Sequence, residues 1–217
     1  MSDYLPELVD RLADGFLVTL QLLVLSALIA TVIGTLLAAM RVSPIAPLRA
    51  FGTAYVNVFR NTPLVVLFLI AVVGLPAVGV LQGSFFSRAV AALSIYTAAF
   101  VCECIRSGIN TVDPGQAEAA RSIGMTFGKS LRIVILPLAF RAVIPPLASV
   151  YIALTKNTSV ASAFGVTDAT YQLSNLNRDF PDSLYLSFLG ISLGYIVIVA
   201  VVSGTVSILE RRAAVGR

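Results

Sequence analysis

The stretch that decides the fold, residues 115–137, reads GQAEAARSIGMTFGKSLRIVILP and stands between two long apolar segments. Asp113 and Pro114 precede it and can start a helix, with Asp113 as the N-cap and Pro114 at the first helical position. Residues 116–123 favour helix, and Gly124 is typical of a helix end. A second short helix is expected to follow it. The stretch therefore predicts a small helical break between two membrane spans.

Composition indicates that much of the remaining chain is embedded in lipid. The chain has 217 residues, of which 58% are hydrophobic and only 12% are charged, whereas soluble domains carry about 25% charged residues. A soluble fold of this length could not hide so much apolar surface. The net charge of +4 is scattered along the chain, without a basic block that tracks phosphates, so nucleic acid is not an expected partner.

The inventory of reactive side chains argues against an enzyme. The chain has no histidine and two cysteines, Cys102 and Cys104. Two residues apart on a helix, the cysteines point to different faces and cannot readily share a metal ion or form a disulfide. We therefore expect no metal site and no Ser-His or Cys-His catalysis.

Five apolar stretches are long enough to cross a bilayer, which requires about 20 residues in a helix. They are residues 15–40, 48–80, 88–109, 142–166 and 183–209. The second is too long for one straight span, and Pro63 offers a kink or break within it. The sequence thus predicts a single all-α membrane domain over residues 1–217, with five transmembrane helices. An amphipathic helix over residues 4–12, lying outside the membrane, is an alternative for the N-terminal residues.

Lysines and arginines set the expected orientation, because they concentrate on the cytosolic side of membrane proteins. If the N-terminus is outside, ten of the fifteen fall on the cytosolic side and three on the outer side. We therefore predict an outer N-terminus, a cytosolic C-terminus and a cytosolic segment at residues 113–137. There Ala119, Ala120, Ile123 and Met125 give the small helix an apolar face that suits the groove of a partner. An ordinary solvated loop is the alternative that composition alone favours.

The spacing within this segment resembles the EAA loop of ABC importer permeases. Glu118-Ala119-Ala120 is followed by Gly124, six residues after the glutamate, and then by Leu136-Pro137. Val134 stands where that family usually has isoleucine, which is a conservative departure. The motif connects the short helix with a known family of membrane proteins.

The resemblance extends over nearly the whole chain. Arg60-Asn61-Thr62-Pro63-Leu64 is similar to the Arg-Gly-Thr-Pro-Leu stretch of polar amino-acid permeases, with asparagine in place of glycine. Residues 96–98 and 103–109 resemble the third span of that family, and Gly115-Gln116 resembles the exit from that span. Lys156-Asn157-Thr158-Ser159 resembles its Lys-(Asp/Asn)-Thr-Ser stretch. The chain is therefore similar to the permease subunits of the polar amino-acid uptake family, which have the type I importer fold.

The resemblance implies one subunit of a four-part, ATP-driven importer in the bacterial plasma (inner) membrane. Such a permease translocates a polar amino acid by alternating access. Its partners are a second permease subunit, identical or homologous, a cytosolic ABC ATPase dimer, an external solute-binding protein and the lipid bilayer. The sequence lacks the Gly-x-x-x-x-Gly-Lys-Ser/Thr phosphate loop. ATP and Mg are therefore assigned to the ATPase, no cofactor is expected in this chain, and this chain is not itself an enzyme.

The family's coupling helix, which docks into a cleft on the ATPase, corresponds to the EAA loop. By this resemblance the coupling residues are Gly115, Glu118, Ala119, Ala120, Gly124 and Met125. Glu118 could anchor the docked helix by its charge, and Gly124 permits a tight reversal of the chain.

Three ionisable residues fall within the predicted spans, and each is a functional hypothesis because charge is costly inside a membrane. Arg60 or Lys156 could pair with a substrate carboxylate, Arg60 in a bidentate manner. Glu103 could pair with a substrate ammonium group. Neighbouring polar side chains could line the path. The substrate-binding candidates are Arg60, Asn61, Thr62, Glu103, Lys156, Asn157 and Thr158.

Each candidate also has a structural alternative. Glu103 could pair with Arg106 on one helix face. Arg60 could cap backbone carbonyls freed by Pro63, and Lys156 could extend its amine to the membrane interface. The polar residues could simply bridge helices.

The substrate class follows from the balance of charge. Two cations, Arg60 and Lys156, against one acid favour an acidic amino acid, with glutamate the best candidate; glutamine, arginine and cystine remain open. Asp168, in the outer region, could contact the solute-binding protein or cap a loop helix. The alternative function is a stand-alone channel or secondary carrier for a small polar solute, which leaves residues 115–137 unexplained.

Overall fold

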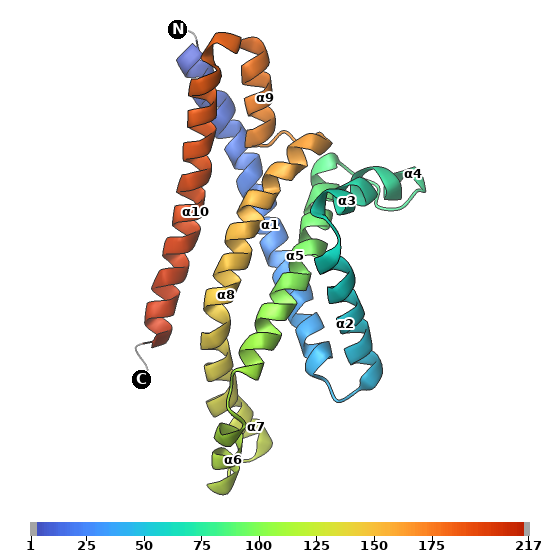
Figure 1. The fold of residues 1–217 in the computed structure, drawn as a ribbon, viewed down its shortest axis with the longest axis vertical. Helices are drawn as coiled ribbons and strands as arrows, with labels where there is room; N and C mark the ends of the chain where they lie inside the picture. The colour runs from blue at the N-terminus through green and yellow to red at the C-terminus, as the bar shows by residue number, and fades with distance from the viewer. Residues whose placement is uncertain (1–3, 215–217) are drawn as a thin grey trace.

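The computed structural model describes residues 4–214, and over this range all regular structure is helical (Figure 1). The elements are α1 (Tyr4–Val42), α2 (Ala46–Asn61), α3 (Leu64–Phe68), η1 (Leu69–Gly74), α4 (Leu75–Ala77), α5 (Phe85–Asn110), α6 (Pro114–Ser122), α7 (Phe127–Ser130), η2 (Leu131–Ile135), α8 (Leu136–Asn157), η3 (Thr158–Phe164), α9 (Ala169–Asp179), η4 (Pro181–Ser183) and α10 (Leu184–Ala214). The prediction of an all-α chain is confirmed for these residues.

Four helical stretches are long and apolar enough to cross a membrane. They are Tyr4–Val42, Phe85–Asn110, Gly128–Phe164 and Pro181–Ile208. A fifth candidate is a broken one, in which α2 and the helical run Leu64–Ala77 meet at an angle of 107°. The structure therefore offers four candidate spans, or five if the bent pair counts as one.

The bend in the second candidate span lies at Pro63, as predicted. Proline has no backbone N–H to continue the helical ladder, and it disfavours helical backbone at the preceding residue. Thr62 accordingly adopts extended backbone, with φ −92° and ψ 129°. The helix resumes at Leu64 and runs away from α2 towards the side of the bundle (Figure 1).

The first helix is longer than predicted, because it includes the N-terminal residues. Tyr4 and Leu8 are buried together with Leu176 of α9. The Tyr4 hydroxyl lies 2.8 Å from Oγ of Ser187 in α10. Residues 4–12 are therefore helical, as that alternative expects, but they are the start of α1 and not a helix of their own, and α9 and α10 cover them.

The centre of the fold is the packing of α1 against α5. The two helices approach closely at Gly34: a Cβ atom there would lie 2.6 Å from Cγ1 of Val101 and 2.9 Å from the carbonyl oxygen of Ala98. Small residues let membrane helices come this close and gain packing contacts. By contrast, many large apolar side chains of α1 and α10 are exposed, as lipid contact requires.

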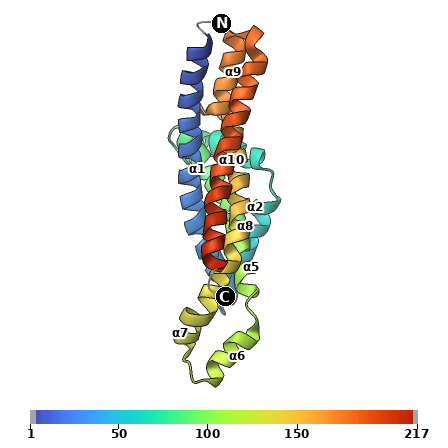
Figure 2. The same cartoon turned by 90° about the vertical axis from the view of Figure 1, so that its left-hand side faces the viewer.

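The two ends of the molecule differ. The start of α1, α9 and the start of α10 gather at one end (Figure 1). The α6–α7 segment projects from the opposite end, beyond the end of α10 (Figure 2). The loop that joins α1 to α2 also lies towards this second end. The predicted coupling residues lie on the projecting segment, and the predicted substrate-binding residues lie along the long helices.

Candidate functional site

The projecting segment begins as the sequence predicts. Oδ1 of Asp113 accepts a hydrogen bond of 2.7 Å from the Gly115 N–H and so caps the first turn of α6. The helix ends at Ser122, and Gly124 follows with a φ of +82°. This left-handed conformation is one that glycine adopts without strain. The predicted helix, its cap and its terminating glycine are all present.

The apolar face of α6 differs from the prediction. Ile123 is 79% exposed, and Ala119 is also exposed. Ala120, however, is buried, and Met125 is half-buried. The expectation that Ala120 is exposed is wrong, because the chain folds back after Gly124 and the Met125 N–H donates to the Ala120 carbonyl at 3.1 Å.

The second helix of the segment is not short, as predicted, but long. The run α7, η2 and α8 is continuous, so Pro137 lies inside this helix, directly after the π-helical segment η2, where the normal hydrogen-bond ladder is already interrupted. The fourth candidate span therefore begins at Gly128 instead of at residue 142. The helix that leaves the projecting segment is thus the same helix that enters the candidate span.

The acidic residue Glu103 sits among three arginines from three helices. Its Oε1 accepts a hydrogen bond from Nη1 of Arg41, at the end of α1. Its Oε2 accepts from Nη2 of Arg106 at 2.9 Å. Nη1 of Arg60, at the end of α2, lies 4.0 Å from Oε1. The alternative in which Glu103 pairs with Arg106 is present. Arg41 was not predicted as a partner of Glu103. The one sequence signal for it was its position directly after the first predicted span.

Arg60 has a second neighbour besides Glu103. The centre of its guanidinium group lies 5.9 Å from the ring centroid of Phe100, within the range of a cation–π interaction. About half of its side chain remains exposed. Arg60 is therefore held at the surface of α5 with donors to spare.

The side chains of Asn61 and Thr62 serve the end of their own helix. Nδ2 of Asn61 donates to the Asn57 carbonyl at 2.7 Å, and Oγ1 of Thr62 donates to the Val58 carbonyl at 2.8 Å. These bonds satisfy carbonyls in the last turn, before the helix breaks at Pro63. Asn61 and Thr62 thus cap this turn, in the role that was predicted as an alternative for Arg60.

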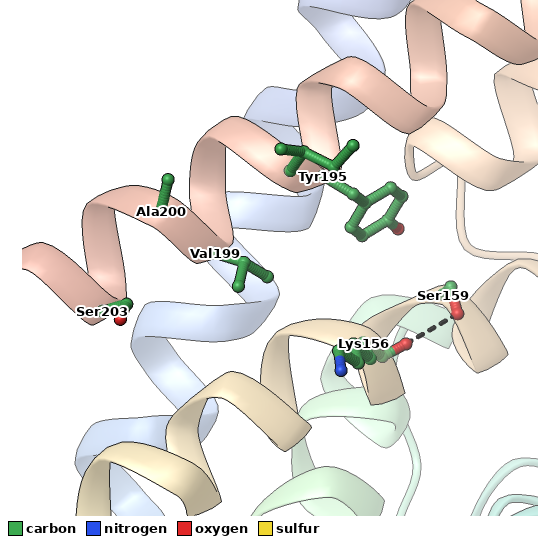
Figure 3. Close-up of a pocket in the computed structure, with 7 residues that line it drawn as sticks. Lys156, Ser159, Tyr195, Val199, Ala200 and Ser203 are labelled. Carbon is green, nitrogen blue, oxygen red and sulfur yellow. Dashed lines mark hydrogen bonds between the residues drawn. The ribbon is translucent and has the colours of Figure 1, made fainter.

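The side chains of Lys156, Asn157 and Thr158 lie in three different places: two line separate hollows, and one is in the core. Lys156 lines a hollow of about 580 Å³ with Ser159 and with Tyr195 of α10 (Figure 3). Asn157 lines a different hollow of about 350 Å³. Thr158 is fully buried and donates to the Thr155 carbonyl at 2.7 Å. Successive residues on a helix point in different directions, which explains this division.

Asn157 and Arg60 are related through Phe100 of α5. The hollow that Asn157 lines lies between α5 and α8 and includes Tyr96, Thr97 and Phe100. Arg60 lies over the ring of Phe100, which lines this hollow, but Arg60 itself does not line it. Lys156, in contrast, faces α10 and does not line it. The structure therefore connects Arg60 with the hollow of Asn157 only through Phe100, and it does not bring Arg60 and Lys156 to one hollow.

Asp168 is a buried carboxyl at the opposite end of the fold. Its side chain is fully buried, and its Oδ1 accepts a hydrogen bond of 2.9 Å from the Tyr171 N–H, which caps α9. Its Oδ2 has no hydrogen-bond partner. Burial raises the pKa of Asp168 to about 7, although backbone hydrogen bonds oppose the shift. The capping alternative is the one seen; burial excludes the side-chain contact with a solute-binding protein.

Comparison with known proteins identifies the family. Residues 8–215 match the family model described as the binding-protein-dependent transport system inner membrane component. The chain belongs to this family. It is thus a multi-pass inner-membrane component, and the resemblance first seen in the EAA loop is confirmed.

Curated relatives of this permease come from several bacteria. The glutamate transport system permease protein GluC of Corynebacterium efficiens is 43% identical over 209 residues, covering 91% of this chain and 92% of the relative. The probable glutamine ABC transporter permease protein GlnM of Bacillus subtilis is 38% identical, covering 92% and 91%. The glutamate/aspartate import permease protein GltJ of Escherichia coli K12 is 33% identical, covering 92% and 85%.

Solved structures agree with the fold. A crystal structure of an amino acid ABC transporter with histidines matches with a TM-score of 0.86 and 34% identity, covering 94% of each chain. An inward-facing MetNI methionine ABC transporter matches with a TM-score of 0.75 and 20% identity, covering 95% of this chain and 97% of that one. The second likeness concerns the fold alone. The permease therefore has the helical arrangement of amino acid ABC transporters.

Proposed function

We propose that this permease moves an acidic amino acid, glutamate first, across the inner membrane. The observation that carries the proposal is the 43% identity with a glutamate transport system permease over 91% of the chain. The glutamate/aspartate import permeases of Escherichia coli, similar over at least 92% of the chain, point the same way. A cluster of three arginines around the single acid Glu103 adds a positive field that suits an anionic substrate.

The proposal includes five spans, an outer N-terminus and a cytosolic C-terminus. On this topology the bent pair of α2 and Leu64–Ala77 is the second span. Support comes from the excess of basic residues at the end of the molecule that carries α6. It follows that α6 lies in the cytosol and α9 outside.

In this topology α6 is the coupling helix, which docks into a cytosolic ABC ATPase dimer. Glu118, Ala119 and Ile123 are exposed on the projecting segment and available to a partner. Gly115 and Gly124 shape the two ends of the helix, whereas Ala120 and Met125 support it from within. ATP and Mg would bind the ATPase. Its closure would move α6, and the continuous helix from Gly128 onwards would carry that motion into the membrane.

The other partners complete the importer. A second permease subunit, identical or homologous, would supply the other half of the pathway, and an external solute-binding protein would deliver substrate. The Escherichia coli relatives include two glutamate/aspartate permease proteins, GltJ and GltK, which favours a homologous second subunit.

The substrate path we favour passes the hollow between α5 and α8. Arg60, which lies over Phe100 of that hollow, would receive a substrate carboxylate, and Asn157 would offer its amide within the hollow. Glu103 is engaged by arginines, so its predicted contact with the substrate ammonium would require that pairing to loosen. Lys156 faces α10 and would act elsewhere along the path.

One reconstitution tests this function. The complex of this chain with its second permease subunit, ATPase and binding protein should accumulate radiolabelled glutamate in vesicles when ATP is present. Arg60→Ala should abolish that uptake, while the ATPase still co-purifies, and Lys156→Ala should reduce uptake less. Glu118→Arg should weaken ATPase association. Full uptake by this chain without the ATPase would favour the channel or carrier instead.

A further inference from the structure

A third hollow, of about 640 Å³, lies where the end of α1, the start of α2 and the end of α5 meet. Five of the residues that line it are basic or polar, namely Arg41, Arg49, Thr53, Asn57 and Arg106, and the other three are the alanines at positions 46, 50 and 54. It is separate from the hollow between α5 and α8, with which it shares no lining residue. The α1–α2 loop beside it points towards the end of the molecule that carries α6 (Figure 1).

The charges around this hollow do not cancel. Arg41 and Arg106 both pair with Glu103, so two cations share one carboxylate. Arg49 donates from Nη1 to two neutral groups, the carbonyls of Ser43 at 3.0 Å and Pro44 at 2.7 Å. Among the side chains that the structure describes, which end at residue 208, Glu103 is the one acid in ion-pair contact with these arginines. The hollow therefore has an excess of two positive charges and free guanidinium donors.

A polar stripe on α2 links this hollow with Arg60. Arg49, Thr53, Asn57 and Arg60 are spaced by four, four and three residues, and so lie on one helix face. The eleven residues from Arg49 to Arg60 rise about 16 Å, roughly half the thickness of a bilayer core.

The large exposed apolar side chains of α2 lie on another face. Phe51 and Val58 are both more than half exposed, and neither lines the hollow. A face turned to lipid would carry such residues, whereas a polar and charged face inside a membrane belongs to a bundle interior or an aqueous path. The stripe from Arg60 to Arg49 therefore faces the path and not the lipid.

We propose that the hollow at Arg41, Arg49 and Arg106 is a second carboxylate site, at which the transported acidic amino acid pauses on the cytosolic side before release. The inference rests on the proposed function and extends it beyond Arg60. The arginines attract the carboxylate, while their existing bonds to Glu103 and to loop carbonyls keep the site weak enough for release. Thr53 and Asn57 provide neutral hydrogen-bonding groups between the two cationic sites.

The test measures inhibition of uptake by glutamate on the cytosolic side. Vesicles hold the complete complex with the ATPase on the lumenal side, and unlabelled glutamate is preloaded at increasing concentration. In the wild type, lumenal glutamate should slow the initial uptake of labelled glutamate. Thr53→Asp places a negative charge in the hollow, and the half-inhibitory lumenal concentration should rise about three- to tenfold, as a like charge within several ångströms requires.

A charge of the same sign at the other end serves as the control. Ser174 is exposed on α9, so Ser174→Asp changes the net charge equally but should leave lumenal inhibition unchanged. Arg49→Gln should raise the half-inhibitory concentration as Thr53→Asp does, and Arg49→Lys should largely restore it. Co-purification with the ATPase and unchanged affinity for the external binding protein establish that the variants are folded.

The outcomes separate the two proposals. If wild-type vesicles accumulate glutamate but lumenal glutamate does not inhibit them, or inhibits Thr53→Asp equally, the second site is refuted and the proposed function stands. If wild-type vesicles accumulate only neutral or basic amino acids, the proposed substrate class fails, and the carboxylate site fails with it.

Discussion

Arg41 donates a hydrogen bond to Glu103 across a sequence separation of 62 residues, and this ion pair joins the last turn of α1 to α5. Both side chains are largely shielded, with 12% and 20% of their surfaces exposed. Arg106 adds two further hydrogen bonds to the same carboxylate. Glu103 is therefore the shared counter-charge of a cluster of arginines at the junction of three helices.

Removal of this acid should destabilise the permease. Glu103→Gln keeps the shape of the side chain but leaves Arg41, Arg106 and Arg60 close together without a counter-charge. We expect a loss of about 1–3 kcal/mol, measured as a lower thermal unfolding temperature of the detergent-solubilised complex. Glu7→Gln is the control, because Glu7 also pairs with an arginine but is 45% exposed, and exposed pairs contribute little. Equal losses in the two variants would contradict a structural role for the cluster.

The close approach of α1 and α5 gives a second prediction. A Cβ atom at Gly34 would come within 2.9 Å of the Ala98 carbonyl oxygen, which cannot move aside without bending α5. Gly34→Ala should therefore destabilise the fold by about 1–3 kcal/mol. At Gly204 in α10, no atom lies within 4 Å of an added Cβ, so Gly204→Ala should be neutral or slightly stabilising. The thermal unfolding temperatures of both variants test this prediction. An unchanged unfolding temperature for Gly34→Ala would show that the helices are farther apart than the structure places them.

Asp168 makes stability depend on pH. Its pKa is about 7 in the fold against 3.8 for the free side chain, so the folded state binds more protons than the unfolded state between these values. Stability should therefore fall as pH rises from about 4 to about 7, on the order of 1–3 kcal/mol. Asp168→Asn keeps the oxygen that caps α9 and should remove most of this dependence. Unfolding temperatures of the wild type and of Asp168→Asn between pH 4 and pH 8 measure this dependence. A wild-type unfolding temperature that rises with pH over this range would contradict a buried Oδ2 without a hydrogen-bond partner.

Much of the fold was predictable because local rules governed it. Hydrophobic length located the helices, Pro63 the bend, and Asp113 with Gly124 the two ends of α6. These features depend on residues adjacent in sequence. The predicted limits of the first and fourth spans were too short, since apolar length marks the membrane core and not the full helix: α1 begins by Tyr4, and the fourth candidate span begins at Gly128.

The sites were less predictable because they depend on contacts between distant residues. Arg106, three residues from Glu103, was foreseen, whereas Arg41 was not, since no local pattern joins positions so far apart. Likewise, sequence order could not show that Arg60 faces α5 while Lys156 faces α10. Arg60 and Lys156 therefore do not line one common substrate site, and an acidic substrate is supported instead by the relatives and by the arginine cluster.

The turn that ends α6 gives the sharpest test of the coupling segment. Gly124 has a φ of +82°, and no atom lies within 4 Å of a Cβ added there. Any effect of Gly124→Ala must therefore come from backbone strain, about 1 kcal/mol, and not from a steric clash. The strain would shift the exposed Ile123 and the rest of the helix end, and ATPase association should weaken about fivefold in a co-purification titration.

Gly128 provides the matched control for this variant. It lies four residues later, also has no atom within 4 Å of an added Cβ, and is part of the helix α7, where its φ is not positive. Gly128→Ala should therefore favour the helix slightly and weaken ATPase association much less than Gly124→Ala. If both variants weaken the complex equally, the added methyl group itself disturbs binding to the ATPase. The left-handed turn at Gly124 then does not set the docking geometry.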